Sequence, residues 1–308
     1  MHLFCRLIPI LSLANVFTAS AQDAPISIKT TADRAQVSIG DFQFAELLFG
    51  SDRAKPVLYP VFGPHQIPMT RDYPFKDTTD GEKHDHPHHE SLWYTHGDVN
   101  GISFWHLGKD AGTIKQTKIG VDGDTITTSN DWLSPDGKRV CSDRRTMRFS
   151  SLPGGARVID FSVTIEASDG DLKFGDTKEG SMGIRTHPLL RTDKGADVTN
   201  SAGQKGKTIW GKAAKWVNYQ ARIDGKPVGV AIFDSPTNPR HPSTWHARDY
   251  GLVAANPFGA HDFSGAAKGA GDLKIKSGES VTFRYAFVFH NGSDEKQSIE
   301  ELYEAWAK

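Results

Sequence analysis

Two long stretches of strict alternation constrain this chain most. In RVIDFSVTIEA, residues 157–167, every second side chain is apolar, and ESVTFRYAFVFH, residues 279–290, repeats the pattern with aromatic side chains. A period of two over this length indicates β-strands with one buried face. Asp-Gly pairs, which favour hairpin turns, stand between such runs at residues 122–123, 136–137, 169–170 and 224–225. The chain therefore has to bury several half-apolar strands against one another.

The one strong helical pattern lies at the C-terminal end. In SIEELYEAWAK, Ile299, Leu302 and Trp306 recur at helical spacing, and Ser298 with Glu301 forms a capping box. Many strands, hairpin turns and one terminal helix predict an all-β fold, a large antiparallel β-sandwich with a short C-terminal helix. Because no fixed-period repeat or low-complexity linker interrupts residues 22–308, we expect a single β-sandwich domain there.

Residues 1–21 are predicted to be a secretory signal peptide. Arg6 precedes an apolar run at residues 7–18, and Ala-Ser-Ala at residues 19–21 is a small-x-small cleavage pattern. This pattern predicts a periplasmic or secreted protein. Cys5 would leave with the signal, so Cys141 would remain alone and could form no intrachain disulfide.

Charge and hydropathy narrow the classes of partner. The chain carries 36 basic and 37 acidic residues, so no positive excess favours nucleic acid or an anionic membrane surface. No later segment approaches the roughly 20 apolar residues that a membrane helix needs. We expect no nucleic acid and no membrane span. Small or neutral partners fit better, which points to a small-molecule or oligosaccharide substrate.

Two long segments, residues 61–105 and 234–262, do not show a strand pattern. Both mix Pro, Gly, His, Asn and Trp. Long structureless loops in a compact domain are usually functional or disordered, and the aromatic residues in both segments argue against disorder. We therefore expect two ordered loops that carry the site.

The first segment holds the densest polar motif, HDHPHHESLWYTHGDVNG at residues 84–101, with five histidines. Imidazole titrates near neutrality and is a common metal ligand. His88, His89 and His96 are the candidate proton donors or acceptors. His86, His88 and His96 could instead be three ligands of a divalent metal with an open fourth position. The spacing matches no standard metal signature, so the cofactor stays unknown, and the histidines could also be hydrogen-bonded loop pins.

The motif DTKEGSMGIRTHPLL, residues 176–190, supplies a carboxylate. Glu179 is a candidate catalytic acid or base, and Arg185 is its predicted electrostatic partner. Gly180 and Gly183 would let the backbone or a ligand approach closely. A turn with a solvated glutamate is the alternative.

Further polar residues are predicted to hold the substrate. Arg71, between two prolines, could grip a carboxylate or sugar hydroxyls through its planar fork. In residues 233–259, amide, imidazole and guanidinium groups lie among aromatic residues, a composition typical of a small-molecule pocket. The predicted substrate-binding residues are Arg71, Asp98, Asn100, Arg185, Asn238, His241, Trp245, His246 and Asn256.

Four segments together resemble a known family. KPVLYPV with MTRDYP, HPHHESLWYTHGDVNGISFW, EGSMGIRT and AIFDSPTNPRHPSTWHARDYGLVAANPFG are similar, in the same order, to the bacterial PmoA-like family labelled methane oxygenase PmoA. That family usually reads His-His-Arg-Gly-Leu-Trp, whereas Glu90-Ser91 stands here in place of Arg-Gly, which puts the specificity in question. The family is in turn similar to galactose-mutarotase-like supersandwich proteins, which implies a concave sugar site with histidine and carboxylate acid–base groups.

The residues and the resemblance together predict an exported carbohydrate-active enzyme, a lyase, hydrolase or epimerase, in which a histidine works with Glu179. Glycoside hydrolysis normally requires two carboxylates, and only Glu179 stands out, so lyase-like or histidine-assisted chemistry is favoured. Two alternatives stay open. One is a metal-dependent enzyme with a histidine-cluster site, to which His246 could add a ligand. The other is a non-catalytic carbohydrate-binding protein, which the density of titratable groups disfavours.

Overall fold

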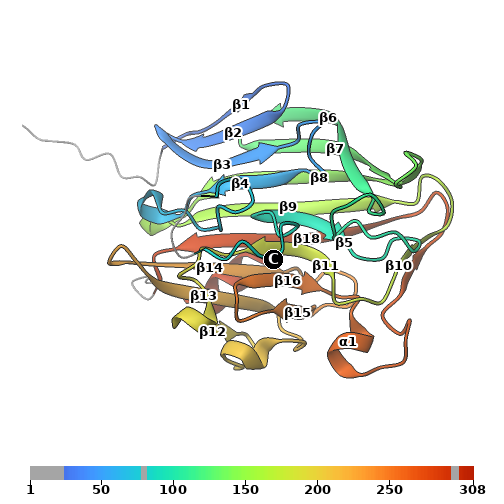
Figure 1. Cartoon of the computed structure of the whole chain (residues 1–308). Coiled ribbons are helices and arrows are strands. Elements are labelled where there is room, and N and C mark those ends of the chain that lie inside the picture. The colour runs from blue at the N-terminus through green and yellow to red at the C-terminus, as the bar shows by residue number, and fades with distance from the viewer. Residues whose placement is uncertain (1–23, 78–81, 293–297) are drawn as a thin grey trace, which may run out of the picture.

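Two eight-stranded antiparallel sheets make up most of the molecule (Figure 1). The computed structural model describes residues 24–77, 82–292 and 298–308, so the predicted signal peptide and Cys5 lie outside the described residues. The predicted all-β fold with large antiparallel sheets is confirmed. The prediction that one domain spans residues 22–308 stays a prediction.

The first sheet carries the candidate site on its outer face. Its strands run in the order β1-β2-β3-β4-β5-β11-β16-β15. Their bounds are β1 Ile26–Thr30, β2 Arg34–Ile39, β3 Phe42–Leu48, β4 Val57–Val61, β5 Leu92–His96, β11 Gly180–Arg185, β16 Leu252–Asn256 and β15 Thr244–Ala247.

The second sheet lies behind the first in the order β12-β13-β14-β18-β9-β8-β7-β6 (Figure 1). Its strands are β12 Asp197–Asn200, β13 Trp216–Ile223, β14 Lys226–Asp234, β18 Ser280–His290, β9 Arg157–Glu166, β8 Arg139–Ser151, β7 Thr125–Leu133 and β6 Thr113–Asp122. A two-stranded pair, β10 Leu172–Phe174 with β17 Leu273–Ile275, completes the strands of the described residues.

The alternating stretches form the middle of the second sheet. β9 and β18 are direct neighbours, with Val163 opposite Phe283, and both of these side chains are buried. The inner faces of the two sheets share one apolar core. Phe44 of β3 meets Phe149 of β8 edge to face, with ring centroids 5.8 Å apart. The four Asp-Gly pairs each lie between strands, as predicted.

The expectation of two strandless loops was wrong in part. Residues 61–105 contain β5, and residues 234–262 contain both β15 and β16. β5 and β16 are buried at every position, so neither shows the polar-apolar alternation by which a half-buried strand is recognised. The sandwich core covers their inner face, and the connecting loops cover their outer face.

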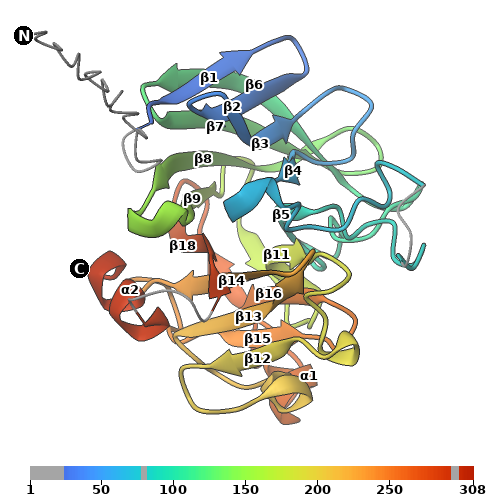
Figure 2. The ribbon, with the colours of Figure 1, turned by 90° about the vertical axis from the view of Figure 1, so that its left-hand side faces the viewer.

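The predicted C-terminal helix is confirmed as α2, Ile299–Trp306, with the Ser298–Glu301 capping box formed. It packs on the outer face of the second sheet, where Tyr303 meets Phe233 of β14 (Figure 2). A five-residue helix, α1 Ala260–Ser264, was not predicted. None of the helices in the described residues is long and apolar enough to cross a membrane.

Candidate functional site

A cavity of about 250 Å³ opens on the outer face of the first sheet. We call it the histidine cavity, and its lining consists of His86, His88, His89, His106, Lys178, Glu179, His246, Arg248 and Tyr250. These residues come from the loops on both sides of β5, the entry to β11, strand β15 and the β15–β16 turn. Figure 2 shows the loops around β5 extending outward from the first sheet.

Arg71 holds the histidine loop in place. Its guanidinium, 2% exposed, donates to the backbone oxygens of Lys83 and Asp85 at 3.0 and 2.9 Å and to the backbone oxygen of His86 at 3.0 Å. It also binds the Asp85 carboxylate at 2.7 Å. Arg71 was predicted to bind substrate. The structure instead directs its donors at the loop, so it positions the cavity wall.

Arg185 links that loop to β11. Its guanidinium donates to Asp85 Oδ1 at 2.8 Å and to His89 Nδ1 at 3.1 Å. It lies 4.6 Å from the centre of the Tyr250 ring. The sequence paired Arg185 with Glu179. The structure pairs it with Asp85, beneath the cavity wall.

The contact with Arg185 fixes the protonation state of His89. Since a guanidinium can only donate, Nδ1 of His89 must accept, and the ring proton of the neutral form lies on Nε2. Burial, and after it the charges of His88 and Arg185, lowers the pKa of His89 far below its usual value. His89 is therefore a neutral hydrogen-bond donor in the cavity lining.

His246 has the opposite tautomer. Its Nδ1 lies 2.8 Å from the backbone oxygen of Lys178, and because a carbonyl only accepts, Nδ1 carries the proton and Nε2 has a free lone pair. Burial lowers the pKa of His246 to about 4. The cavity thus has a neutral imidazole donor and a neutral imidazole acceptor.

Glu179 is the one carboxylate that lines the histidine cavity within the described residues. Its side chain is 22% exposed, and Oε1 lies 3.4 Å from Lys178 Nζ. His88 stands nearby with His106, at 5.1 Å between ring centres, and burial lowers the pKa of His88 to about 3. Of the three histidines predicted as partners of Glu179, His88 and His89 line the same cavity as Glu179, and His96 does not.

The floor of the site is a row of outer-face residues on neighbouring strands. The register aligns Trp93, Gly183, Ala254 and His246 across β5, β11, β16 and β15. A Cβ on Gly183 would come within 2.9 Å of the Trp93 ring. The close approach that Gly183 was expected to permit is therefore made by an indole that supports His89, at 5.7 Å between ring centres.

His96 lies apart from the cavity. It is fully buried between Phe174 and Phe258, with Nε2 on the backbone oxygen of Gly175 at 2.8 Å and Nδ1 on the Ser181 hydroxyl at 3.2 Å. Both ring nitrogens are thus occupied. The predicted metal set of His86, His88 and His96 is not brought together, and the described residues contain no group of three His, Cys, Asp or Glu side chains arranged to hold a metal.

Other predicted binding residues hold turns or the core. Asp98 accepts from Gly101 N at 2.8 Å, and Asn100 bonds β10 at Lys173 N at 2.7 Å. Asn238 and His241 both bond the buried Asp234 at 2.8 Å.

Trp245 and Asn256 also lie away from the cavity lining. Trp245 is fully buried in the sandwich core and donates to the backbone oxygen of Ala214 at 2.9 Å. Asn256 binds the backbone oxygen of Thr177 at 2.9 Å, and so holds the segment that leads into Glu179. Of these two, only Asn256 acts on the site, and it does so indirectly.

Comparison with known proteins places the chain in a family. A model described as a family of unknown function (DUF6807) matches residues 34–304. The chain belongs to this family. The comparison with curated proteins gives no match. None of the matches named here carries the PmoA label, so that resemblance stays a prediction.

Two solved structures are similar to this DUF6807 chain over most of its length. One is a galactose mutarotase related enzyme from Lactobacillus acidophilus, 11% identical, with a TM-score of 0.33, covering 89% of this chain and 100% of that one. The other is a GalM/aldose epimerase homologue from C. elegans, 7% identical, with a TM-score of 0.36, covering 88% of this chain and 100% of that one.

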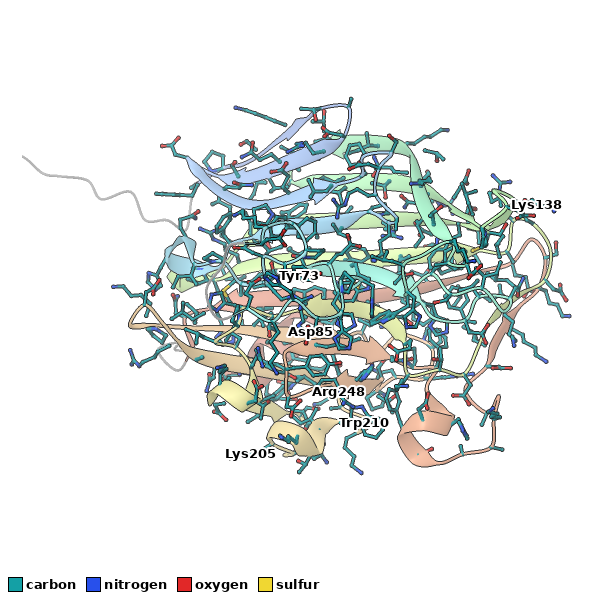
Figure 3. The ribbon with its side chains drawn as sticks, in the orientation of Figure 1. Tyr73, Asp85, Lys138, Lys205, Trp210 and Arg248 are labelled. Atoms are coloured by element: carbon teal, nitrogen blue, oxygen red, sulfur yellow. The ribbon has the colours of Figure 1, made fainter. Side chains whose placement is uncertain are left out.

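Arg248 and Tyr250 lie in residues 233–259, the stretch in which a small-molecule pocket was predicted for this DUF6807 chain. Neither they nor His106 and Lys178 were among the predicted substrate-binding residues, yet all four line the cavity. Arg248 and Tyr250 belong to the turn between two strands that were not predicted. Asp85 and Arg248 are labelled in Figure 3, on the face of the first sheet that is turned toward the viewer.

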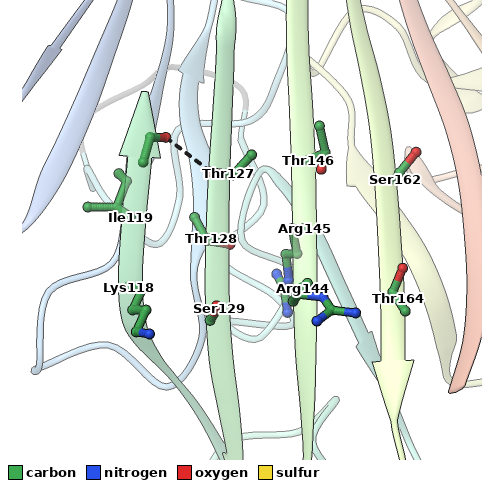
Figure 4. Close-up of a pocket in the computed structure, with 11 residues that line it drawn as sticks. Lys118, Ile119, Thr127, Thr128, Ser129, Arg144, Arg145, Thr146, Ser162 and Thr164 are labelled. Atoms are coloured by element: carbon green, nitrogen blue, oxygen red, sulfur yellow. Dashed lines mark hydrogen bonds between the residues drawn. The ribbon is translucent and has the colours of Figure 1, made fainter. Parts of the chain in front are cut away.

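A second cavity, of about 390 Å³, lies across β6, β7, β8 and β9 of the second sheet (Figure 4). We call it the threonine cavity, because Thr127, Thr128, Thr146 and Thr164 line it. It is larger than the histidine cavity. However, its lining contains no histidine and no carboxylate, and Lys118 is its one side chain of ordinary acid–base type.

Proposed function

We propose that the histidine cavity is the active site of an exported enzyme that transfers protons on a carbohydrate, as an epimerase or a lyase does. The observation that carries this proposal is the pair of opposed tautomers beside Glu179. His89 offers an N–H, and His246 offers a lone pair. Acid–base catalysis requires that the group that donates or accepts a proton lie within hydrogen-bond reach of the reacting group.

The three groups take different roles. Glu179 is the base, because an ionised carboxylate accepts a proton without first losing one. His89, which stays neutral, donates a hydrogen bond to the substrate oxygen that gains negative charge, a role that neutral imidazoles with a lowered pKa can fill. His246, with a pKa of about 4, is a weak base, so it accepts a hydrogen bond from a substrate hydroxyl and orients it.

The lining favours a substrate rich in hydroxyl groups. All nine lining side chains carry a hydrogen-bonding group, whereas most small-molecule pockets are predominantly apolar. A carbohydrate offers a donor and acceptor on nearly every carbon, which matches such a wall. The volume of about 250 Å³ lies below the roughly 300–1,000 Å³ of drug-sized pockets, so one sugar unit at a time would occupy it.

The number of carboxylates argues against ordinary glycoside hydrolysis. Both common hydrolytic mechanisms use a pair of carboxylates across the scissile bond. Within the described residues Glu179 is the one carboxylate in the lining, and the nearby Asp85 is bound by Arg71 and Arg185. Epimerisation and elimination need one base and one donor, which the cavity has.

The test is a nuclear magnetic resonance assay in D₂O with a panel of neutral and acidic sugars and their oligosaccharides. Wild-type protein should accelerate anomer exchange, carbon-bound deuterium uptake or formation of an unsaturated product with at least one sugar. Glu179→Gln should lower that rate about 10²–10⁴-fold, the usual contribution of a general base.

Glu166→Gln, at the end of β9 on the second sheet, is the matched control and should retain the wild-type rate. If sugars bind but neither protein turns any of them over, the chain is a carbohydrate-binding protein and the proposed chemistry is wrong.

A further inference from the structure

The buried layer beneath the histidine cavity has more positive than negative groups. Arg71 and Arg185 are 2% and 1% exposed and share one carboxylate, Asp85, at 2.7 and 2.8 Å. Two guanidinium groups therefore share one directly bound acid, and Glu82 adds a more distant negative charge that acts on Arg71. Burying such an excess is costly unless further negative charge or hydrogen-bond acceptors compensate it, and here backbone oxygens of the histidine loop supply part of that compensation.

Two cations also share one carboxylate at Glu90. Glu90, directly after His89 in the chain, binds Lys55 and Arg53 at 2.6 Å each. Lys55 is 1% exposed, and its charge is one of those that lower the pKa of His88, after burial and His106. The positive excess thus extends under the histidines that line the cavity.

The cavity lining likewise contains two cationic side chains and one carboxylate. Glu179 is flanked by Lys178, and Arg248 lines the same cavity. Within the described residues Arg248 has no ion pair and no side-chain hydrogen bond; its guanidinium lies 5.6 Å from the centre of the Tyr250 ring. Arg191, by contrast, is bound by Asp193 through two nitrogens.

The histidines do not offset this positive charge, because an imidazole side chain does not supply a negative charge in either of its ordinary forms. The overall charge of the chain is −1, so the excess is local and not a property of the whole surface. A concave site with one sign of charge and low-dielectric walls attracts ligands of the opposite sign.

We infer that the substrate is an acidic sugar, whose carboxylate binds Arg248 with Lys178 as the second cation. The inference rests on the proposed function and specifies its substrate class. A guanidinium matches a carboxylate with two parallel N–H donors, and the free guanidinium of Arg248 offers such a fork. The nearly equal numbers of acidic and basic residues in the sequence suggested small or neutral partners. The local positive charge at the histidine cavity narrows that expectation to a small, negatively charged partner.

The experiment compares matched pairs of methyl glycosides, the uronates of glucose, galactose and mannose against their neutral parents, by isothermal titration. Wild-type protein should bind at least one uronate about ten-fold or more tightly than its neutral parent, and the preference should shrink as salt rises. Arg248→Met should abolish the preference. Arg248→Lys, which keeps the charge and loses the fork, should retain part of it.

Arg144→Met is the control, since Arg144 is an exposed cation at the threonine cavity. It should leave the preference intact. Equal binding of acid and neutral sugar, binding of neither, or a preference that survives in Arg248→Met would each overturn the inference. The 6-sulfates of the same methyl glycosides are titrated as well, and tighter binding of these sulfates than of the uronates would overturn the choice of a carboxylate.

The two proposals fail separately. Turnover of neutral sugars that depends on Glu179 would keep the proposed function and reject the acidic substrate. Binding of uronates that depends on Arg248, without turnover by any variant, would keep the acidic ligand and reject the enzyme.

Discussion

The histidine cavity and the threonine cavity are both polar hollows on the outer sides of the sandwich, yet only the first is lined by histidines and a carboxylate. Over the threonine cavity the side chains stand on an open sheet, and Arg144 is 65% exposed. Over the histidine cavity, loops cover the sheet and His89 is 1% exposed. Burial shifts pKa values, and the hydrogen-bond partners that surround a buried ring fix its tautomer. The comparison teaches that the covering loops, more than the polar residues themselves, make a reactive site.

The largest effect should come from releasing the loop. Arg71→Met removes a buried cation that holds four backbone oxygens of the histidine loop and the Asp85 carboxylate. We expect a loss of about 3 kcal/mol in the free energy of unfolding together with nearly all activity. Chemical denaturation and the D₂O assay measure the two. Arg148→Met, in an exposed pair with Asp124, is the control, and equal losses in both variants would contradict the role given to Arg71.

A smaller effect should follow from freeing His89. Arg185→Met removes the donor to Nδ1, so either nitrogen of His89 can carry the proton. We expect a loss of roughly 10–100-fold in activity, by analogy with metal-binding histidines that lose the partner that orients their ring. The rate constant should fall more than the affinity, because the ring stays in the cavity. A change confined to affinity would show that Arg185 binds substrate directly.

The third effect is a pH dependence of stability that comes from His96, a histidine in the core and not in the cavity. Burial lowers the pKa of His96 to about 4, from 6.5 in the unfolded chain. As the pH falls below 6.5, the unfolded chain takes up a proton that the folded chain does not, so stability decreases down to about pH 4. Wild-type protein should therefore lose about 1–2 kcal/mol more than His96→Gln between pH 7.5 and pH 5. If the two proteins lost the same free energy of unfolding between pH 7.5 and pH 5, the prediction would be contradicted.

The smallest effect is expected at the threonine cavity. Thr146→Val on β8 removes a surface hydroxyl and should change the free energy of unfolding by less than about 0.5 kcal/mol. Sugar turnover should match that of the wild type. A clear drop in turnover would show that the second sheet takes part in function. It would contradict the view that only the histidine cavity acts on the substrate.

The sequence predicted the strands in which polar and apolar residues alternate, and it missed strands that are covered on both faces. β9 and β18 were recognised because one face of each is less buried than the other, whereas β5 and β16 are covered on both faces and leave no pattern. The same gap explains Trp245 and His246. Adjacent residues of a strand point to opposite faces, so Trp245 enters the core and His246 the cavity, but β15 itself was not predicted.

The histidine motif shows the limit at the site. His89 and His96 stand in one motif, yet His89 lines the cavity and His96 lies between two phenylalanines in the interior. Residue type alone cannot separate them, because the distinction depends on which long-range neighbours each ring meets. Glu179 could be singled out from its motif. The hydrogen-bond partners of Arg71 and Arg185 could not be predicted, because they are brought close only when the histidine loop folds.

The way Arg71 holds the histidine loop has a consequence for how such a protein can change over generations. Five of its contacts are to backbone oxygens, of Tyr73, Lys83, Asp85, His86 and His89, and every residue type has a backbone oxygen. The side chains at positions 86 and 88 can therefore be exchanged while the loop keeps its course. A lineage with this scaffold can acquire a new substrate by substitution at the wall, without first rebuilding the support.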